Sequence, residues 1–346
     1  MSPTLPSPAS EEGIGRGSGI KMSTPIRIAV DLSGSEKGPA EVLEGAIRAR
    51  QEGNLEIILV GQRSAVTGKN LGGCLFLEAP LAIPMSEKVS RELLRNQDSS
   101  LFKIVNLVRE NKADAAVSGG NTSCFVALAT TLLGTIPGVE RSGIAIFLPK
   151  VSGDTILIDA GANTATVSKH LVSYAVMGSF LHEAIFNSEK PRVGLLNVGE
   201  EETKGSDLYR ETYLLLKQDQ RLNFIGNVEG HDIFSPKVDV VVADGFTGNC
   251  ILKTVEGVTE DFASFLKNEI TGKKLENEPA VAEILSNFIR RGDFAEYSGG
   301  FLMGISGLCV IIHGRSGAEA HRKAILRARD AAADNLMSHL RQGYGG

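Results

Sequence analysis

Glycine, asparagine and serine recur directly after apolar, strand-like segments along much of the chain. Ser118-Gly-Gly-Asn121-Thr122 follows ADAAV, Gly161-Ala-Asn163 follows TILIDA, and Thr247-Gly248-Asn249 lies just after VDVVVAD. Glycine allows a ligand to approach the backbone N–H groups closely, and the N-terminus of a following helix favours negative charge. The pattern predicts a site that binds phosphate or stabilises an oxyanion.

Seven strand ends carry such residues, and ligands of open α/β sheets bind at the carboxyl ends of strands. We therefore expect substrate or phosphate to be bound by Asp31, Gly34, Ser118, Gly120, Thr122, Gly161, Glu200, Glu201, Glu229, Gly230, Gly245, Gly248, His313, Gly314 and Ser316.

Several of the titratable candidates also have ordinary structural explanations. Asp244 stands where a helix N-cap is expected, and His313 follows an apolar run, as a core histidine would. Lys253 is also typical of a surface lysine, and Glu200 and Glu201 of a solvated loop. These alternatives remain open at the level of sequence.

Apolar strands alternate with helices, which is typical of an α/β protein. We predict strands at 26–32, 56–62, 74–79, 113–119, 143–149, 155–160, 193–198, 222–228, 238–244 and 308–314, and helices at 40–53, 99–111, 124–133, 169–186, 250–270, 279–291 and 318–340. The strands are continuous apolar runs, which favours parallel strands covered on both faces. We expect a doubly wound three-layer α/β/α sandwich formed by one domain over 25–345, with a helical excursion at about 265–300 and a disordered tail at 1–24.

Composition narrows the class of function. The 346 residues carry a net charge of −5, so nothing favours nucleic acid, and no apolar run is long enough to span a membrane. The four cysteines lack metal-ligand spacing and fit a reducing cytoplasm. We find no P-loop, no dinucleotide fingerprint and no GxSxG elbow, and we expect neither a metal nor a cofactor.

Four stretches closely resemble one enzyme family: ADAAVSGGNT (113–122), PRVGLLNVGEEETKGSDL (191–208), NFIGNVEGHDIF (223–234) and VDVVVADGFTGNCILKT (238–254). They are similar to the PlsX family, the phosphate acyltransferases of bacterial phospholipid synthesis, over about 26–329. The resemblance implies a fold related to phosphotransacetylase and to the isocitrate/isopropylmalate dehydrogenases. It also implies transfer of a fatty acyl group from acyl carrier protein to inorganic phosphate, for use by a membrane glycerol-3-phosphate acyltransferase.

Roles for individual residues follow from the resemblance together with the strand-end pattern. We hypothesise that phosphate and thioester are surrounded by Thr122 and four asparagines, Asn121, Asn163, Asn227 and Asn249. Lys204 and Lys253 would supply positive charge. Glu200, Glu229 and Asp244 would orient these groups. The catalytic candidates are Asn121, Asn163, Asn227, Asn249, Lys204, Lys253 and Asp244.

The loop after Asn163 departs from the family pattern. Ala165 stands where the family has aspartate, and Val167-Ser168 where it has Lys-Pro. Two alternatives therefore stay open: a non-catalytic homologue that binds acyl carrier protein, and a phosphotransacylase that uses coenzyme A.

The resemblance further implies a homodimer in the cytoplasm with peripheral membrane contact. An apolar stripe at 279–291 could meet either lipid or a dimer mate. Acyl carrier protein is acidic, so we expect it to dock on basic residues of the last helix, namely Arg315, Arg322, Lys323, Arg327 and Arg329. An ordinary helix with internal charge pairs is the alternative explanation.

Overall fold

A computed structural model describes residues 24–151, 153–275, 278–292 and 299–344. The predicted tail lies outside the described residues apart from Thr24. The strands are β1 (Ile26–Asp31), β2 (Leu55–Gly61), β3 (Leu75–Glu78), β4 (Ala115–Ser118), β5 (Gly143–Lys150), β6 (Gly153–Ile158), β7 (Arg192–Leu196), β8 (Asn223–Val228), β9 (Val240–Val242), β10 (Gly300–Met303) and β11 (Leu308–Ile311).

The α-helices are α1 (Pro39–Gln51), α2 (Arg91–Arg95), α3 (Ser100–Arg109), α4 (Thr122–Leu133), α5 (Ser168–Phe186), α6 (Asp207–Gln218), α7 (Gly245–Gly272), α8 (Pro279–Gly292), α9 (Ala318–Ala333) and α10 (Leu336–Gly343). Two 3₁₀ turns, η1 (Arg63–Ala65) and η2 (Gly230–Phe234), complete the elements.

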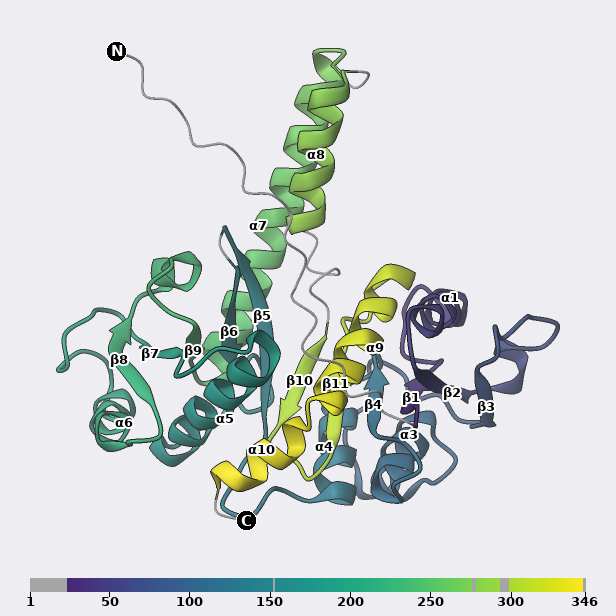
Figure 1. Ribbon diagram of the computed structural model, residues 1–346, viewed down its shortest axis with the longest axis horizontal. Coiled ribbons are helices and arrows are strands. Elements are labelled where there is room, and N and C mark those ends of the chain that lie inside the picture. Colours follow the sequence, from purple (N-terminus) through teal and green to yellow (C-terminus); the bar gives the residue numbers. More distant parts are fainter. Residues whose placement is uncertain (1–23, 152, 276–277, 293–298, 345–346) are drawn as a thin grey trace.

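One sheet of eleven strands runs through the molecule in the order β3-β2-β1-β4-β11-β10-β5-β6-β9-β7-β8, with helices on both faces (Figure 1). Successive residues of β1 illustrate the layers, because Ile28 and Val30 join the core beneath α1, α5 and α9 while Ala29 joins the core beneath α3 and α4. Both faces of the strand are buried, as its continuous apolar run predicted. The three-layer α/β/α class is confirmed.

The expectation of an all-parallel sheet is wrong at its centre. β10 pairs antiparallel with both β11 and β5, and β5 pairs antiparallel with β6. Three reversals therefore separate two parallel sets, the β1 half (β1–β4 and β11) and the β6 half (β6–β9). A continuous apolar run reports burial on both faces, but burial does not fix strand direction.

This reversal changes where the strand ends lie. The carboxyl ends of the two halves point in nominally opposite directions along the sheet, so the seven loops do not share one edge. Neighbouring strands rotate by about 20–25°, so the five steps from β4 to β9 turn the strand direction by on the order of 100°. That turn brings the two carboxyl edges toward each other near the middle of the sheet.

Local sequence explains most helix boundaries. Ser99 caps α3 by accepting the N–H of Phe102, and Leu101, Ile104, Val105 and Val108, which share one face at helical spacing, are buried. Sequence reasoning gave no bounds for α6 and missed the short elements α2 and β10. The predicted last helix is two helices, because Asn335 adopts a left-handed conformation with φ of 53° between α9 and α10.

α7 and α8 pack on each other and project from the sheet (Figure 1). Of the 28 residues of α7, only Gly245 and Gly248 at its base are buried. Val258, Phe262 and Phe265 are more than half exposed along α7, as is Ile284 on α8. The projecting pair, called the α7–α8 hairpin below, therefore presents an apolar stripe to solvent.

Candidate functional site

The first cluster of predicted residues lies at the ends of β1 and β4. The Asp31 carboxylate accepts the Ser118 hydroxyl at 2.8 Å and the Ser33 N–H at 2.9 Å, and the Ser118 oxygen accepts the Gly120 N–H at 3.0 Å. A methyl group on Gly34 would lie 2.7 Å from the Gly119 nitrogen, so glycine is required by this close approach. Burial raises the pKa of Asp31, which is 2% exposed. Asp31 therefore organises the loop from inside the protein.

The loop after β11 completes this edge. Gly314 accepts the Glu36 N–H at 2.7 Å through its carbonyl, and the Ser35 hydroxyl donates to the Ser316 carbonyl at 3.3 Å. The His313 carbonyl would lie 3.5 Å from a methyl group on Gly119. The structure thus brings Asp31, Gly34, Ser118, Gly120, His313, Gly314 and Ser316 together.

The second cluster surrounds Asp159, at the end of β6. One carboxylate oxygen accepts the N–H groups of Ile144, Gly161 and Ala162 at 2.8–3.0 Å. The other accepts the backbone and side-chain N–H groups of Asn163 at 2.9 and 3.1 Å. Sequence reasoning did not single out Asp159 as a site residue, although an aspartate ending an apolar strand was a visible signal.

Asn163 is held by the protein as well. Its side-chain amide also donates to the Ser142 carbonyl at 2.6 Å and to the Tyr174 hydroxyl at 2.9 Å. Gly161 adopts φ of +132°, which residues other than glycine avoid. The loop therefore has a fixed shape, and Asn163 contributes to that shape.

The base of α7 is pressed against this loop. A methyl group on Gly245 would lie 2.8 Å from an Asp159 carboxylate oxygen, and one on Gly248 would lie 2.9 Å from the Asp159 carbonyl carbon. Both glycines are thus required by helix packing. Asn249 lies beside Gly161 and is exposed, and its side chain forms no hydrogen bond with any described residue.

Asp244 has the structural role that the sequence left open. Its carboxylate accepts the N–H groups of Phe246 and Thr247 and the hydroxyls of Thr247 and Tyr209, and so caps α7. Burial opposes ionisation, but these hydrogen bonds outweigh it and lower the pKa of Asp244. Burial together with the Asp244 carboxylate raises the pKa of Tyr209 to about 12. The N-terminus of α7 therefore already has its negative partner.

One contact joins the two clusters. The Lys253 ammonium nitrogen lies 2.9 Å from Nε2 of His313 and 2.7 Å from Glu256, while Nδ1 of His313 accepts the Arg315 N–H at 3.2 Å. Burial and the neighbouring Lys253 lower the pKa of His313. A neutral imidazole can accept at only one nitrogen, so two donors compete for His313. The contact lies where α7 of the β6 half meets the β11 loop of the β1 half.

Asn121 stands at the N-terminus of α4, but its amide is fully engaged. Oδ1 accepts the Cys124 N–H at 3.0 Å, and Nδ2 donates to the carbonyls of Pro84, Met85 and Glu87 at 2.9–3.0 Å. In this conformation Asn121 anchors residues 84–87 to α4. The neighbouring Thr122 is half-buried, and its hydroxyl bonds to no described residue.

The remaining predicted residues form a third cluster at the ends of β7 and β8. Lys237 pairs with Glu200 and Asp232, and Asn227 donates to the Glu201 carbonyl at 2.9 Å. Glu229 faces His231, Gly230 begins η2, and Lys204 is exposed without an ion pair among the described residues. The hydrogen bond from Tyr209 of α6 to Asp244 ties this region to the base of α7. The five asparagine and threonine candidates are therefore divided among three places.

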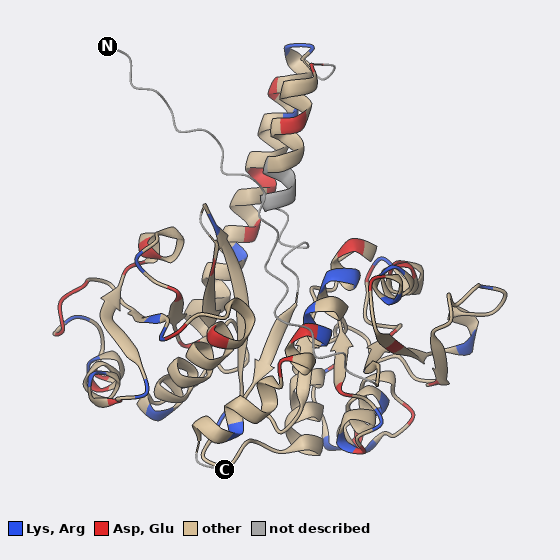
Figure 2. Cartoon of the chain, viewed as in Figure 1, with Lys and Arg blue, Asp and Glu red and all other residues tan. Residues whose placement is uncertain are grey.

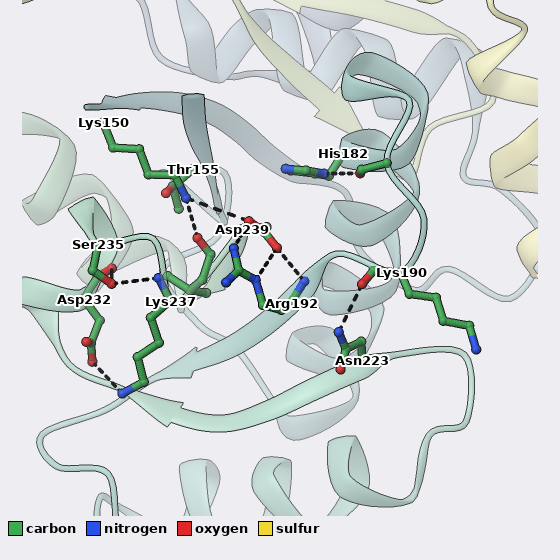
Figure 3. A network of polar contacts seen from close by, with 12 residues as sticks. Lys150, Thr155, His182, Lys190, Arg192, Asn223, Asp232, Ser235, Lys237 and Asp239 are labelled. Carbon is green, nitrogen blue, oxygen red and sulfur yellow. Dashed lines mark hydrogen bonds and ion pairs between the residues drawn. The ribbon is translucent and has the colours of Figure 1, made fainter. Parts of the chain in front are cut away.

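A polar network missed by sequence reasoning lies at the starts of β7 and β9 (Figure 3). Arg192 forms two 2.8 Å side-chain bonds with Asp239, and the buried Lys150 donates to the Val238 carbonyl at 2.7 Å. Burial lowers the pKa of Lys150. The network ties the β5–β6 turn to the strand edge opposite the candidate site.

The basic residues predicted to dock a carrier protein on α9 are mostly paired. Arg322 bonds Glu319 and Glu52, Lys323 faces Glu319, and Arg329 faces Asp330. Arg327 stacks over Phe147 at 4.5 Å. Figure 2 shows acidic and basic residues intermingled along this helix. The alternative of an ordinary charge-paired helix describes α9 well, whereas Arg315, which precedes the helix, forms no ion pair within the described chain.

The described residues contain no group of three or more histidine, cysteine, aspartate or glutamate side chains placed to bind a metal ion. Likewise, their helices include none that is both long and apolar enough to cross a membrane.

Comparison with known proteins identifies relatives of this chain. The family model described as "Fatty acid synthesis protein" matches residues 26–339. A phosphate acyltransferase of Thermodesulfovibrio yellowstonii is 40% identical over 325 residues, covering 91% of this chain and 93% of the relative. One of Desulforudis audaxviator is 39% identical, covering 92% and 96%.

Solved structures agree on the fold. A phosphotransacetylase from Streptococcus pyogenes superposes with a TM-score of 0.58 at 18% identity, covering 90% of this chain and 95% of that one. A 4-hydroxythreonine-4-phosphate dehydrogenase from Klebsiella pneumoniae superposes with a TM-score of 0.51 at 14% identity, covering 90% and 98%. Identity this low supports the fold alone, whereas the family match and the sequence relatives go further: the chain belongs to the fatty acid synthesis protein family, the PlsX family, in which its relatives are named phosphate acyltransferases.

Proposed function

We propose that this protein is an active phosphate acyltransferase that makes acyl phosphate from a long-chain acyl carrier protein thioester and inorganic phosphate, and so serves phospholipid synthesis. A phosphate oxygen attacks the thioester carbonyl carbon, the new C–O bond forms, and the C–S bond breaks. The proton of hydrogen phosphate ends on the departing sulfur. The reaction requires a bound anion and donors for the oxyanion, and no redox cofactor.

The observation that supports this proposal best is the contact between Lys253 and His313. It sets a cation and a histidine with competing donors at the place where both halves of the sheet meet. The exposed amide of Asn249 rises from the same helix, one turn before Lys253. A cation and an unbonded side-chain amide are suited to binding a dianionic phosphate.

The direct test measures product. The purified protein is incubated with palmitoyl carrier protein and phosphate, and acyl phosphate is trapped as the hydroxamate. We expect product that depends on both substrates. Palmitoyl coenzyme A is run in parallel, because preference for it would favour the coenzyme A-dependent alternative.

The altered loop gives the non-catalytic alternative its own test. Binding of acyl carrier protein without any hydroxamate would establish that alternative. The variant Ala165→Asp/Val167→Lys restores the family's aspartate and lysine and leaves Ser168 in place of its proline. A large gain in rate would show that the natural loop limits catalysis, and an unchanged rate would show that the loop is not needed.

The α7–α8 hairpin supports a second part of the proposal, peripheral membrane contact. Its stripe of Val258, Phe262, Phe265 and Ile284 is exposed, and two lysines, Lys273 and Lys274, lie near its tip, where Lys273 pairs with Glu269 (Figure 2). An apolar face with basic residues is suited to an anionic lipid surface. Such contact would bring acyl phosphate to a membrane glycerol-3-phosphate acyltransferase. Of the predicted stripe at 279–291, Val281 and Leu285 are half-buried, and the side chains of 288–291 lie outside the described residues.

The same stripe could instead be covered by a second copy of the chain, as the expected homodimer requires. Phe262→Glu/Phe265→Glu separates the two, with sedimentation on anionic liposomes measured beside analytical ultracentrifugation. Loss of liposome binding from an unchanged oligomer supports lipid contact. Conversion to monomer supports the dimer interface.

A further inference from the structure

Residues 84–95, called the strap below, cross the surface beside the candidate site. The strap is anchored at both ends. The Asn121 amide donates to three of its carbonyls, and Leu93 and Leu94 of α2 pack against the core beneath α3 and α4. The strap is therefore a fixed part of the protein surface.

The strap lies directly against the loop that carries His313. The methyl carbon of Met85 would be 2.8 Å from a methyl group on Gly314, so its side chain covers that glycine. Glu36 approaches Gly314 from the other side, and the Lys37 ammonium lies near Gly317. A partner seated on the strap would thus contact the rim of the candidate site.

The outer face of the strap combines exposed apolar and unpaired basic groups. Met85 is 48% and Val89 45% exposed. Lys88, Arg91 and Arg95 are exposed, and none of them forms an ion pair with a described residue. An open pocket of about 490 Å³ is lined by Arg91, Glu92, Arg95 and Asn96. Methionine and arginine are enriched in protein interfaces, and charges at the rim of an interface guide association.

The charge balance of this region favours an acidic partner. The strap holds three basic and two acidic residues, a net charge of +1, and Lys37, Arg315 and Glu36 raise the local sum to +2. The whole chain carries −5. On α9, by contrast, Arg322, Lys323 and Arg329 are already paired with Glu319, Glu52 and Asp330, and Arg327 stacks over Phe147.

We propose that the strap, with Arg315, is the docking surface for the acidic carrier protein that delivers the acyl thioester. This inference rests on the proposed function, and it moves the expected docking site from α9 to residues 84–95. The apolar pair Met85 and Val89 would form the centre of the contact, and the unpaired cations its rim.

The test compares two triple variants that carry the same change of charge. The strap variant is Lys88→Glu/Arg91→Glu/Arg95→Glu. The control is Lys69→Glu/Arg109→Glu/Lys190→Glu, whose three residues are also exposed and lack ion pairs within the described chain. Each is assayed with palmitoyl carrier protein and with palmitoyl pantetheine, which presents the thioester without the protein.

We expect the strap variant to lose about tenfold or more in kcat/KM with the carrier-protein substrate, because charge reversal at a rim slows association. Activity with palmitoyl pantetheine should not change. Rising salt should reduce the difference between wild type and the strap variant, because salt weakens the association of wild type with the carrier protein. The control should behave as wild type with both substrates. An equal loss on both substrates, or an equal effect of the two variants, would overturn the proposal.

A binding measurement keeps the docking surface testable apart from catalysis. Fluorescence anisotropy with labelled carrier protein is measured at low salt. If wild type makes no acyl phosphate from either thioester, the proposed function fails. Binding lost only in the strap variant would then still support the docking surface, and absence of binding to wild type would refute it.

Discussion

Asp31 and Asp159 end strands in the two halves of the sheet, and both are buried carboxylates whose pKa is raised by burial. They differ in what surrounds them. Asp159 accepts five N–H groups, whereas Asp31 accepts one N–H and one hydroxyl. Four of the five donors to Asp159 are backbone N–H groups, which cannot reorient, whereas one of the two donors to Asp31 is a hydroxyl, which can. This difference sets the sizes of the effects expected below.

The largest effect is expected where α7 presses on Asp159. Gly248→Ala places a methyl group against the Asp159 backbone, and we expect a loss of about 3 kcal/mol in unfolding free energy. Gly257→Ala is the matched control, because nothing lies within 4 Å of its added methyl. It should stabilise the helix by up to about 1 kcal/mol. Urea unfolding measures the free energy of unfolding of both variants. Equal changes in the two variants would show that the close packing at Gly248 is not needed.

Two buried histidines, one in each half, extend the comparison to pH. Burial lowers the pKa of His321 to about 4, and neither of its ring nitrogens has a hydrogen-bond partner among the described residues, whereas His182 pairs with Ser188 at 2.7 Å. The unfolded chain takes up the proton first, so stability falls as pH drops from about 6.5 toward 4, by at most about 3 kcal/mol from His321.

His321→Leu should flatten this acid loss when unfolding is followed against pH. Burial also lowers the pKa of His182, so His182→Leu is the companion variant. We expect it to flatten the curve less. A steep acid loss that survives in His321→Leu would contradict the assignment.

The aspartates themselves can be compared by the same change. In Asp159→Asn, whichever oxygen becomes an amino group faces at least two N–H donors, and we expect a loss of about 2–3 kcal/mol. In Asp31→Asn the Ser118 hydroxyl can turn and accept, so the loss should stay below about 1 kcal/mol. Guanidinium unfolding measures both. A larger loss of stability in Asp31→Asn than in Asp159→Asn would contradict the proposed difference between the two carboxylates.

The smallest stability effect is expected at Asn249, the one candidate asparagine whose side chain forms no hydrogen bond within the described chain. Asn249→Ala should change unfolding free energy by less than about 0.5 kcal/mol, since its side chain bonds to no described residue. The rate of acyl phosphate formation should still fall more than about tenfold if the Asn249 amide donates to the oxyanion or to phosphate. Asn121→Ala, which removes a cap and the anchors of the strap, should cost about 2 kcal/mol. An unchanged rate in Asn249→Ala would remove it from the site.

Sequence alone determined the local features. The α/β class, the buried stripe of α3, the cap Ser99 and the glycine-asparagine strand ends depend on short-range chemistry, which a single chain displays. The family resemblance followed from the same loops. The elements missed, α2 and β10, are only five and four residues long and lack a full period of pattern.

Tertiary structure alone decided which polar groups remain available. Asn121, Asn163 and Asp244 carry the residue types of a binding site, yet their hydrogen bonds are filled by segments such as 84–87, Ser142 and Tyr209, which are distant in sequence or in a neighbouring element. The reversals at β5 and β10 likewise depend on pairing between remote strands. Lys253 meets His313 across 60 residues because the twist of the sheet brings the base of α7 to the loop after β11. Side-chain type is local information, whereas hydrogen-bond satisfaction and strand direction belong to the whole fold.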